Sequence, residues 1–308
     1  MNRDSKIFIA GHTNMIGCSF LSYLKNNGYK KIIAKTPAEL DLTDQLRVKE
    51  FFFSTRPDYV ILAAGKSGGI QANITYPGDY IYNNLQIESN VIHFAWKSGV
   101  KKLLFLGSAC MYPRICPQPM KEDYLLTGRP EPTSECYAVA KIAGIKLCQA
   151  YNMQYGTCFI PVVPASIYGP HDDFDPGSGH VLAALLRKIH EAKVNNEKGV
   201  AVWGTGSPRR EFLYVDDLVE ACILLLNHCN EPELINIGFG RDISIKELAH
   251  LIKGIAGYGG DICFDETKPD GAARKLLDVA KIRGMGWKPG VRLEEGIKRT
   301  YEWYLKHQ

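Results

Sequence analysis

The chain contains 308 residues, of which 45% are hydrophobic and 23% are charged, and its formal net charge is +4. This composition predicts a globular protein with a substantial core, in one large or two coupled domains. The small positive charge favours an anionic ligand but is too low for a nucleic-acid partner. No stretch approaches the roughly 18 consecutive apolar residues of a transmembrane helix, so we expect no membrane partner.

The cysteines indicate a reducing compartment. There are nine of them, scattered along the chain without a C-x-x-C pair. This pattern argues against a disulfide framework or a structural zinc site. The apolar run near the N-terminus, residues 7–10, is too short for a signal peptide. We therefore expect a cytoplasmic protein without a metal.

Short apolar runs alternate with helical patterns through the first half of the chain. The predicted strands cover residues 6–11, 31–35, 58–65, 101–109 and 158–169. The predicted helices end near residue 26, begin near residue 43, and span 79–98 and 133–147. Strands that alternate with helices imply right-handed crossovers, and hence a parallel sheet covered on both faces. The sequence therefore predicts an α/β fold with a Rossmann-type, doubly wound parallel sheet.

The composition of the sequence changes after residue 169, where Asp, Pro and Gly become frequent. We expect residues 1–169 to form a dinucleotide-binding Rossmann domain. Residues 170–308 then form a smaller C-terminal region that mainly binds substrate. A later segment, about 213–240, is expected to return to the first domain, because the run at 234–240 reads as a further strand.

A glycine turn follows the first predicted strand. A strand, a tight turn and a helix N-terminus form a cradle for a pyrophosphate, because the free N–H groups and the helix dipole face the anion. The alternative is a plain pair of turn glycines. Asn14 stands where a middle glycine is usual, and asparagine tolerates positive φ better than most residues. The expected cofactor contacts here are Gly11, Asn14, Met15, Ile16 and Gly17.

The ends of the second and third predicted strands suggest the type of cofactor. NAD enzymes of this fold place a carboxylate after the second strand, for the ribose diol. This chain has Lys35 there, and a cation suits the 2′-phosphate of NADP(H). Asp41 and Leu42 are expected near the adenine. The small residues Ala63, Ala64 and Gly65 would lie against the cofactor, where larger side chains would block it.

Three polar residues follow the fourth predicted strand. Ser108 lies at its C-terminal end, where open α/β sheets bind ligands. Tyr137 and Lys141 are four residues apart on the next long helix, which Thr133 or Ser134 caps, so they share a face. A nearby ammonium would lower the pKa of the tyrosine towards the working range. The alternative is that Tyr137 and Lys141 are simply neighbours on an exposed helix face, but Ser108 and the dinucleotide cradle favour a catalytic group.

Several stretches together resemble the GDP-L-fucose synthase family of extended short-chain dehydrogenases: GHTNMIG, LGSACMYP, EPTSECYAVAKIAGIKLC, YGPHDDFDPGSGHV, VWGTGSPRREFLYVDD and KPDGAARKLLD. The resemblance covers nearly the whole chain. It implies a dual epimerase/reductase that acts on GDP-4-keto-6-deoxy-mannose, inverts C3 and C5, and reduces the C4 ketone with NADPH. It also implies a homodimer formed through the helices near 79–98 and 134–152.

The same resemblance assigns roles to individual residues. It places Ser108, Tyr137 and Lys141 in a reductase triad, in which Ser108 also contacts the substrate. Cys110 and His180 take the acid/base positions of epimerisation. Pro164 and His180 would also contact the cofactor. The GDP end of the substrate would meet Arg187, Trp203, Arg210 and Lys275.

The chemistry of these side chains fits that assignment. A C4 ketone acidifies the protons on both neighbouring carbons, so epimerisation needs one group to remove a proton and another to return it on the opposite face. Thiol and imidazole groups, with ordinary pKa values of ~8.5 and ~6.5, both exchange protons near neutrality. Alone, Cys110 reads as a small buried residue and His180 as a surface residue. Beside a ketone-binding serine and tyrosine, they read as catalysts.

Some positions depart from the family pattern. Thr13 and Pro37 stand where the family has arginines, which leaves the strength of the NADP(H) preference open. Ala165 and Ser166 stand where the family usually has Thr-Asn beside the nucleotide sugar. A related GDP-4-keto sugar, such as a dideoxy or heptose derivative, therefore remains an alternative substrate.

Two other functions are compatible with a Rossmann fold. A 4,6-dehydratase would carry an Asp-Glu pair after Ser108, but this chain has Ala109, Cys110 and Met111 there. A non-catalytic dinucleotide sensor would not need Ser108, Tyr137 and Lys141 together. The sequence thus favours an epimerase/reductase over both.

Overall fold

The computed structural model describes residues 1–230, 232–268 and 270–308. Its central element is a parallel sheet with the strand order β2-β1-β3-β4-β5-β9. The strands are β1 (Lys6–Ala10), β2 (Lys31–Ala34), β3 (Tyr59–Leu62), β4 (Lys102–Leu106), β5 (Phe159–Pro164) and β9 (Ile235–Ile237). This order is that of a doubly wound Rossmann-type sheet, and the predicted fold class is confirmed.

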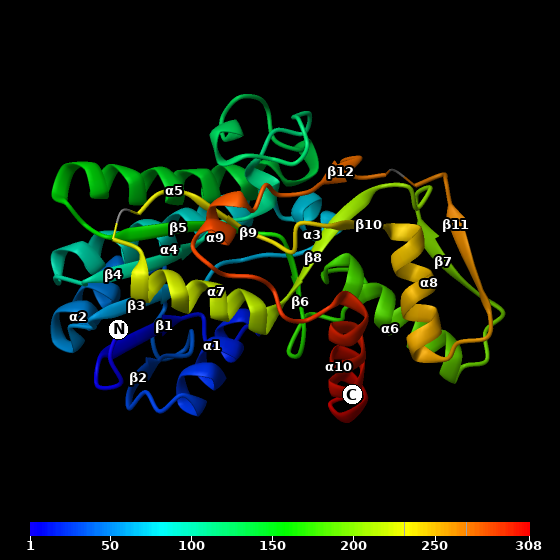
Figure 1. Cartoon of the computed structure of the whole chain (residues 1–308), viewed down its shortest axis with the longest axis horizontal. Coiled ribbons are helices and arrows are strands. Elements are labelled where there is room, and N and C mark those ends of the chain that lie inside the picture. Colours follow the sequence, from blue (N-terminus) through cyan, green and yellow to red (C-terminus); the bar gives the residue numbers. More distant parts are fainter. Residues whose placement is uncertain (231, 269) are drawn as a thin grey trace.

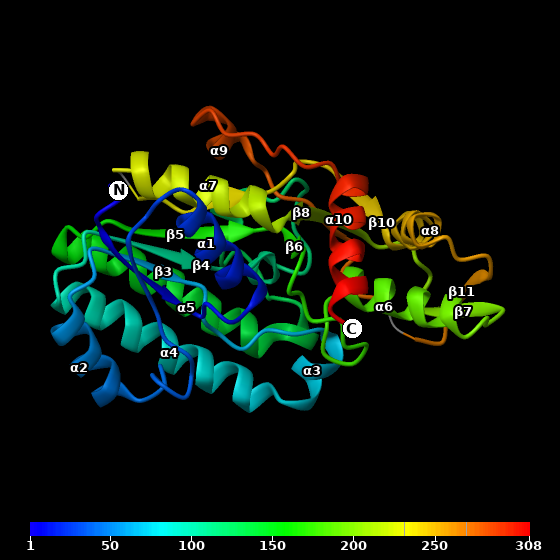
Figure 2. The same ribbon diagram turned by 90° about the horizontal axis from the view of Figure 1, so that it is seen from below.

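The strands of this sheet are nearly continuous apolar runs because helices cover both faces. Helices α1 (Met15–Asn26) and α7 (Val215–His228) lie together on one face (Figure 2). Helices α2 (Gln45–Thr55), α4 (Pro77–Lys97) and α5 (Glu135–Tyr155) lie on the other. The predicted helices are therefore confirmed, and a short helix that was not predicted, α3 (Ile70–Thr75), precedes α4.

One predicted strand is wrong in extent. Residues 158–169 form two strands in different sheets, β5 and β6 (Ser166–Tyr168), and β6 pairs with β8 (Arg209–Tyr214). Pro164 has no N–H to donate, and Ala165 donates the next bond, to the carbonyl of Ile237 at 2.9 Å. The chain then leaves the central sheet for the second region, so β5 and β6 join the two parts of the molecule.

The second region has a hydrophobic core of its own. Figure 1 shows it at the opposite end of the long axis from β1 and β2. Its helices are α6 (Val181–Val194), α8 (Ile245–Ala256) and α10 (Leu293–Lys306), whereas α9 (Ala280–Gly284) packs against β9 of the central sheet. Its strands, besides β6 and β8, are β7 (Gly199–Trp203), β10 (Asp242–Ser244), β11 (Asp261–Asp265) and β12 (Arg274–Lys275). Helices α6 and α8 pack together, and α10 packs against α8.

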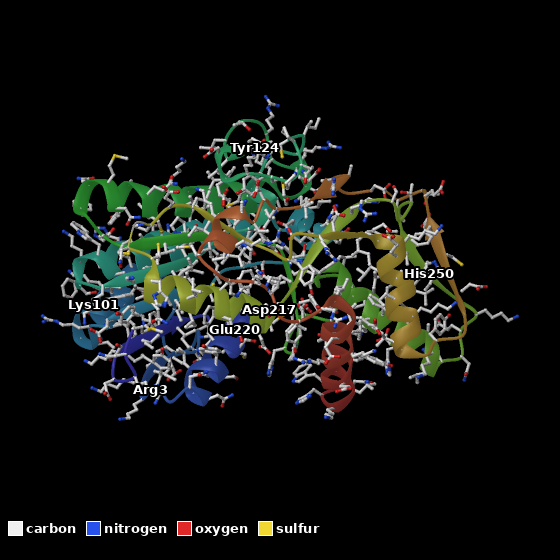
Figure 3. The ribbon with its side chains drawn as sticks, viewed as in Figure 1. Arg3, Lys101, Tyr124, Asp217, Glu220 and His250 are labelled. Atoms are coloured by element: carbon white, nitrogen blue, oxygen red, sulfur yellow. The ribbon has the colours of Figure 1, made fainter. Side chains whose placement is uncertain are left out.

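Buried hydrogen bonds tie the late segments to the central sheet. Figure 3 labels Asp217, near the start of α7, whose carboxylate accepts from the backbone of Gly290 and Val291 at 2.8 and 3.0 Å. Figure 3 also labels Tyr124 on the loop between β4 and α5, which protrudes from the molecule. Glu122 holds that loop to the sheet, because its Oε1 accepts from the backbone N–H of Asn236 in β9 at 3.0 Å.

No helix within the described ranges is long and apolar enough to cross a membrane.

Candidate active site

The glycine turn after β1 is packed too tightly for any larger residue. Gly11 has a φ of +91°, and a Cβ added there would lie 2.6 Å from the backbone N of Ala64. A Cβ on Gly17 would lie 2.1 Å from the carbonyl oxygen of Gly11. The first turn of α1 therefore lies close against the ends of β1 and β3. Such a turn leaves the helix N-terminus open to an anion.

Asn14 has a different role from the one expected. Its φ is −88°, so the idea that asparagine supplies a positive φ is wrong, and Gly11 supplies it instead. Asn14 is the N-cap of α1: its Oδ1 accepts from the N–H of Gly17 at 2.8 Å, and its Nδ2 donates to the carbonyl of Ala63 at 2.7 Å. The side chain thus connects the α1 turn to the end of β3. Met15 and Ile16, in the first turn of α1, follow this cap.

The residues after β3 leave little free space. Gly65 has a φ of +151°, and a Cβ there would lie 2.7 Å from Asn84 Oδ1 and 3.5 Å from Lys141 Nζ. Asn84 also accepts from the backbone N–H of Lys66 at 2.9 Å. Gly65 therefore has no room for a side chain and lies beside the Tyr137–Lys141 helix. Contact of residues 63–65 with a cofactor stays a prediction.

The residues expected around the adenosine are held by local contacts. Lys35 Nζ lies 3.2 Å from Glu39 Oε1, and both side chains are largely exposed. Glu39 also accepts from the backbone and hydroxyl of Thr36, and these bonds lower the pKa of its carboxyl to about 2. The Lys35 cation is therefore neutralised by an ionised carboxylate. Asp41 accepts from Thr43, and the carbonyl of Leu42 accepts from Asn90.

Ser108, Tyr137 and Lys141 come together at the end of β4. The Ser108 side chain is close enough to Tyr137 to oppose part of the rise in the tyrosine pKa, and the Lys141 ammonium lies 5.9 Å from the centroid of the Tyr137 ring. In α5, Ala138, Lys141, Ile145 and Cys148 recur every three or four residues and are buried, so this face of the helix packs on the sheet. The packing holds the tyrosine beside the serine.

The expected depression of the tyrosine pKa is wrong in this structure. Burial raises the pKa of Tyr137 well above its usual value, and the neighbouring Cys110 and Glu88 raise it further. Lys141 does not offset this, because its Nζ forms an ion pair with Glu88 Oε1 at 3.0 Å. A tyrosine with a raised pKa keeps its proton at neutral pH and can serve as a proton donor.

Cys110 and two predicted cations share this end of the sheet. Cys110 lies in the short 3-10 helix Ala109–Met111, and Ser108 Oγ accepts from its backbone N–H at 3.4 Å. Lys275 is close enough for the Cys110 thiol to raise its pKa, although desolvation lowers it more strongly. Lys275 in β12 pairs directly with Arg210 in β8. Desolvation also lowers the pKa of Arg210.

His180 lies at the start of the second region. It is the N-cap residue of α6, and its side chain is exposed. Partial desolvation lowers its pKa, and the nearby Asp173 opposes the shift. Asp173 also raises the pKa of Tyr80, whose ring meets the Tyr137 ring edge-on at 6.2 Å. The His180 loop thus borders the tyrosine through Asp173 and Tyr80.

The structure does not bring every predicted residue into this cluster by a described contact. Arg187 in α6 forms ion pairs with Glu191 at 2.7 Å and Asp175 at 4.0 Å. Trp203 ends β7 and is 54% exposed, with Lys268 over its ring. Pro164 is buried at the end of β5. Among the described residues there is no group of three or more side chains that could hold a metal ion.

A polar stripe on α4 was not predicted. Tyr80, Asn84 and Glu88 follow one another at intervals of four, so they share a helix face, and all three are buried. Tyr80 meets Tyr137, Asn84 supports the loop after β3, and Glu88 pairs with Lys141. Polar residues at helical spacing on an otherwise apolar face were the signal in the sequence.

Glu131 was not predicted either. Its carboxylate faces the cations Arg114, Arg210 and Lys275.

The sequence and the structure of the chain are similar to those of known proteins. The sequence model of the NAD dependent epimerase/dehydratase family matches residues 7–238. The chain is 53% identical to GDP-L-fucose synthase 1 of Arabidopsis thaliana, over 99% of this chain and 95% of that protein. The chain belongs to the GDP-L-fucose synthase family.

Other members and neighbours of the GDP-L-fucose synthase family extend this result. The chain is 49% identical to GDP-L-fucose synthase of Escherichia coli, over 98% of this chain and 97% of that protein. It also matches the solved structure of MlghC, a GDP-mannoheptose C4 reductase from Campylobacter jejuni with NADP bound. That match has a TM-score of 0.89 and 41% identity, and covers 99% of both chains. The similarity thus includes the second region as well as the Rossmann sheet.

Proposed function

We propose that this protein is an epimerase/reductase that converts a GDP-4-keto-6-deoxy-mannose-type sugar nucleotide to GDP-L-fucose. One observation carries the proposal: the side chains of Ser108 and Tyr137 interact at the end of β4, and Ser108 Oγ accepts from the N–H of Cys110. A ketone oxygen that binds these two hydroxyls would have the thiol at one side. Membership of the GDP-L-fucose synthase family supports the reading.

Epimerisation requires an enolate and two proton-exchanging groups. The hydroxyls of Ser108 and Tyr137 hydrogen-bond to the C4 oxygen, and so stabilise the negative charge that develops there when a proton leaves C3 or C5. Cys110 and His180 come from different elements, the 3-10 helix after β4 and the start of α6. In this proposal one removes the proton and the other returns a proton on the opposite face. The lowered pKa of His180 favours the neutral imidazole, which can accept a proton.

Reduction uses the same hydroxyls. Gly11, Asn14 and Gly17 fit a dinucleotide, because a Cβ on either glycine would close the turn and Asn14 fixes the helix N-terminus. NADPH, when bound, supplies a hydride to C4. Tyr137 then gives its proton to the C4 oxygen, and Lys141 faces the tyrosinate that remains.

We propose NADP(H) as the cofactor. The NADP bound to the MlghC structure supports this choice. In this chain, Lys35 is the cation after β2, and Asp41 and Leu42 follow it in the loop. Because Glu39 neutralises Lys35, we expect only a modest preference for NADPH over NADH.

Substrate binding falls mainly to the second region in this proposal. Arg210 and Lys275 are paired across β8 and β12 and are both strongly desolvated, so a diphosphate would gain much from them. Trp203 and Arg187 would meet the rest of the GDP. The cofactor then belongs to residues 1–169 with the returning segment 213–240, and the GDP sugar mainly to 170–308.

We further propose a homodimer through α4 and α5. Tyr82 and Val139, one on each helix, are 62% and 41% exposed. A shallow depression across the two helices is lined by Gln86, Ser89, Asn90, His93, Leu147 and Tyr151, together with Gln45. Light scattering after size exclusion tests this proposal: a monomeric mass would contradict it.

A cytoplasmic location is also part of the proposal. No disulfide joins any of the nine cysteines in the portion of the chain that the structure describes. A reducing compartment keeps thiols such as Cys110 in the form that acid/base chemistry needs.

The deciding experiment is incubation with GDP-4-keto-6-deoxy-mannose and NADPH, with the product stereochemistry determined by NMR. We expect GDP-L-fucose and stoichiometric oxidation of NADPH. Tyr137→Phe is the control: it keeps the ring but removes the proton donor, so reduction should fall roughly 100-fold or more. Absence of turnover by the wild type would contradict the proposal.

A second candidate is C4 reduction, with or without epimerisation, of a related GDP-4-keto heptose or dideoxy sugar. The similarity to MlghC favours it, as do the small Ala165 and Ser166 at the crossing between β5 and β6. A lower KM for the heptose than for the deoxy sugar in the same assay would select this alternative.

A further inference from the structure

A buried carboxylate forms an ion pair with the lysine of the proposed triad. Glu88 Oε1 lies 3.0 Å from Lys141 Nζ, and the two side chains are only 2% and 6% exposed. They come from α4 and α5, which pack side by side (Figure 2). Gly144 makes room for the pair, because a Cβ there would lie 2.6 Å from Glu88 Oε2. The pair therefore depends on a close approach of the two helices.

Stability of the fold alone does not account for this ion pair. Apart from the contact with Lys141, no described group donates a hydrogen bond to either Glu88 oxygen. Burial raises the pKa of Glu88, and Lys141 opposes that shift. An enclosed ion pair with few other hydrogen bonds recovers little of its desolvation cost, and apolar side chains of similar volume often pack as well or better. The position of Glu88 beside Tyr137 and Lys141 gives it another use.

We propose that Glu88 is a positioning residue for the reduction step, which rests on the function proposed above. Its carboxylate holds the Lys141 ammonium at a fixed place beside Tyr137 and cancels most of the lysine charge. Tyr137 therefore stays protonated until the C4 oxygen takes its proton. With Glu88 removed, the uncompensated ammonium would favour the tyrosinate too early.

The other groups around this pair are identifiable. Besides Glu88, the titratable groups that face Tyr137 are Tyr80 from α4 and Cys110 from the 3-10 helix. The groups that face Glu88 are Tyr137, Lys141 and Cys148, all from α5. Glu88 is the one carboxylate in this set, so its replacement changes the local charge without touching another acid.

Glu88→Gln tests the proposal through the pH profile of ketone reduction. The variant keeps the shape of the side chain, and we expect the basic limb of kcat to move to lower pH by about one unit. At the acid end of the range, kcat should stay within about threefold of wild type, because Tyr137 is protonated there in both proteins. Glu122→Gln is the control: it also removes a buried carboxylate, but one bonded to Asn236 in β9, and its profile should match wild type.

An unchanged basic limb in Glu88→Gln would overturn the proposal, even if activity fell uniformly, because a structural role alone lowers activity at every pH. Glu88→Asp keeps the charge, so the basic limb of its kcat profile should lie at the same pH as in the wild type. If Glu88→Gln does not fold, a limb that moves in Glu88→Asp despite its retained carboxylate contradicts the proposal.

A substrate-free readout separates this proposal from the proposed function. Ultraviolet difference titration, with Tyr137→Phe subtracted, follows the ionisation of Tyr137 without any sugar or cofactor. We expect Tyr137 to ionise at lower pH in Glu88→Gln than in the wild type, whichever sugar the enzyme reduces. An identical titration in both proteins would overturn the role of Glu88, while absence of turnover with the GDP sugar would overturn only the proposed function.

Discussion

The backbone N–H of Gly69 donates to the carbonyl of Ser178 at 2.7 Å. This bond joins the loop after β3, which borders the cofactor cradle, to the loop that carries His180. Gly69 lies at the start of α3 with a φ of −66°, so its backbone conformation suits any residue. Space is the constraint, because a Cβ on Gly69 would lie 2.7 Å from the carbonyl oxygen of Gly179.

Gly69→Ala should therefore displace the His180 loop. We expect solvent deuterium exchange into the substrate to fall by roughly tenfold or more, as for a misplaced catalytic group, while NADPH affinity changes little. Gly78→Ala is the matched control, because a Cβ at Gly78 would have nothing within 4 Å. Equal exchange rates in the two variants would mean that the contact between the loops does not position His180.

The sequence predicted the Rossmann part of the fold because each βα unit there is local. Apolar runs define β1 to β5, and the helices between them follow from periodicity. It failed at residues 158–169, where β5 and β6 belong to different sheets. That division depends on the partners of each strand, β9 and β8, which come much later in the chain.

The candidate site was predictable in its residue types but not in its electrostatics. Spacing placed Tyr137 and Lys141 on one helix face and suggested a lowered tyrosine pKa. The opposite shift arises because Glu88, from another helix, pairs with Lys141. Likewise Glu39 engages Lys35. The Glu88 pairing joins α4 to α5, so only the folded chain reveals it.

Glu39→Gln should increase the preference for NADPH over NADH. The substitution removes the anion that lies 3.2 Å from Lys35 Nζ, so the lysine is free to approach a 2′-phosphate. We expect KM for NADPH to fall by up to a few-fold, as is typical of an exposed charge, with KM for NADH unchanged. Parallel steady-state assays with both cofactors measure the effect. Equal changes in the two KM values would show that Lys35 does not sense the phosphate.

Arg210→Ala should weaken substrate binding selectively. Loss of one charge-assisted hydrogen bond in a desolvated site costs about 1.5–3 kcal/mol, so KM for the sugar nucleotide should rise roughly 10- to 100-fold. Arg209→Ala is the control from the same strand, since Arg209 instead pairs with Asp242 at 2.8 Å. Fluorescence titration should show unchanged NADPH affinity in both variants. An unaltered KM in Arg210→Ala would place the diphosphate elsewhere.

Asp172→Asn should change how stability depends on pH. Burial raises the pKa of Asp172 to about 7, and its Oδ2 has no hydrogen-bond partner among the described residues. The folded state thus holds this proton more tightly than the unfolded state, so the wild type loses stability as pH rises from about 4 through about 7. A rise from 3.8 to about 7 corresponds to roughly 4 kcal/mol at most.

Thermal unfolding at two pH values checks this expectation. Near pH 4 or below, Asp172→Asn and the wild type should have similar Tm values, and at about pH 8 the variant should have the higher Tm. The amide keeps an oxygen for the bond that Oδ1 accepts from the N–H of Asp173 at 2.8 Å. The same Tm difference at both pH values would mean that Asp172 is ionised throughout.

Variants of Cys110 and His180 should separate epimerisation from reduction. Cys110 follows Ser108 by two residues and reaches the ketone from the β4 end, whereas His180 comes from the second region. Hydride transfer to C4 needs neither side chain, because Tyr137 supplies the proton. A serine hydroxyl is a far weaker acid than a thiol, so Cys110→Ser should yield GDP-6-deoxy sugars with unchanged C3 or C5.

NMR analysis of products formed in deuterated solvent measures this separation. In Cys110→Ser, deuterium at C3 and C5 should fall at least 100-fold, as for loss of a positioned acid or base, while NADPH is still oxidised. His180→Gln should show a similar defect at a different step, because the imidazole acts on the other face. Its lowered pKa also predicts that wild-type exchange persists below about pH 6.5. If both variants exchange deuterium at the wild-type rate, Cys110 and His180 are not the acid and base of epimerisation.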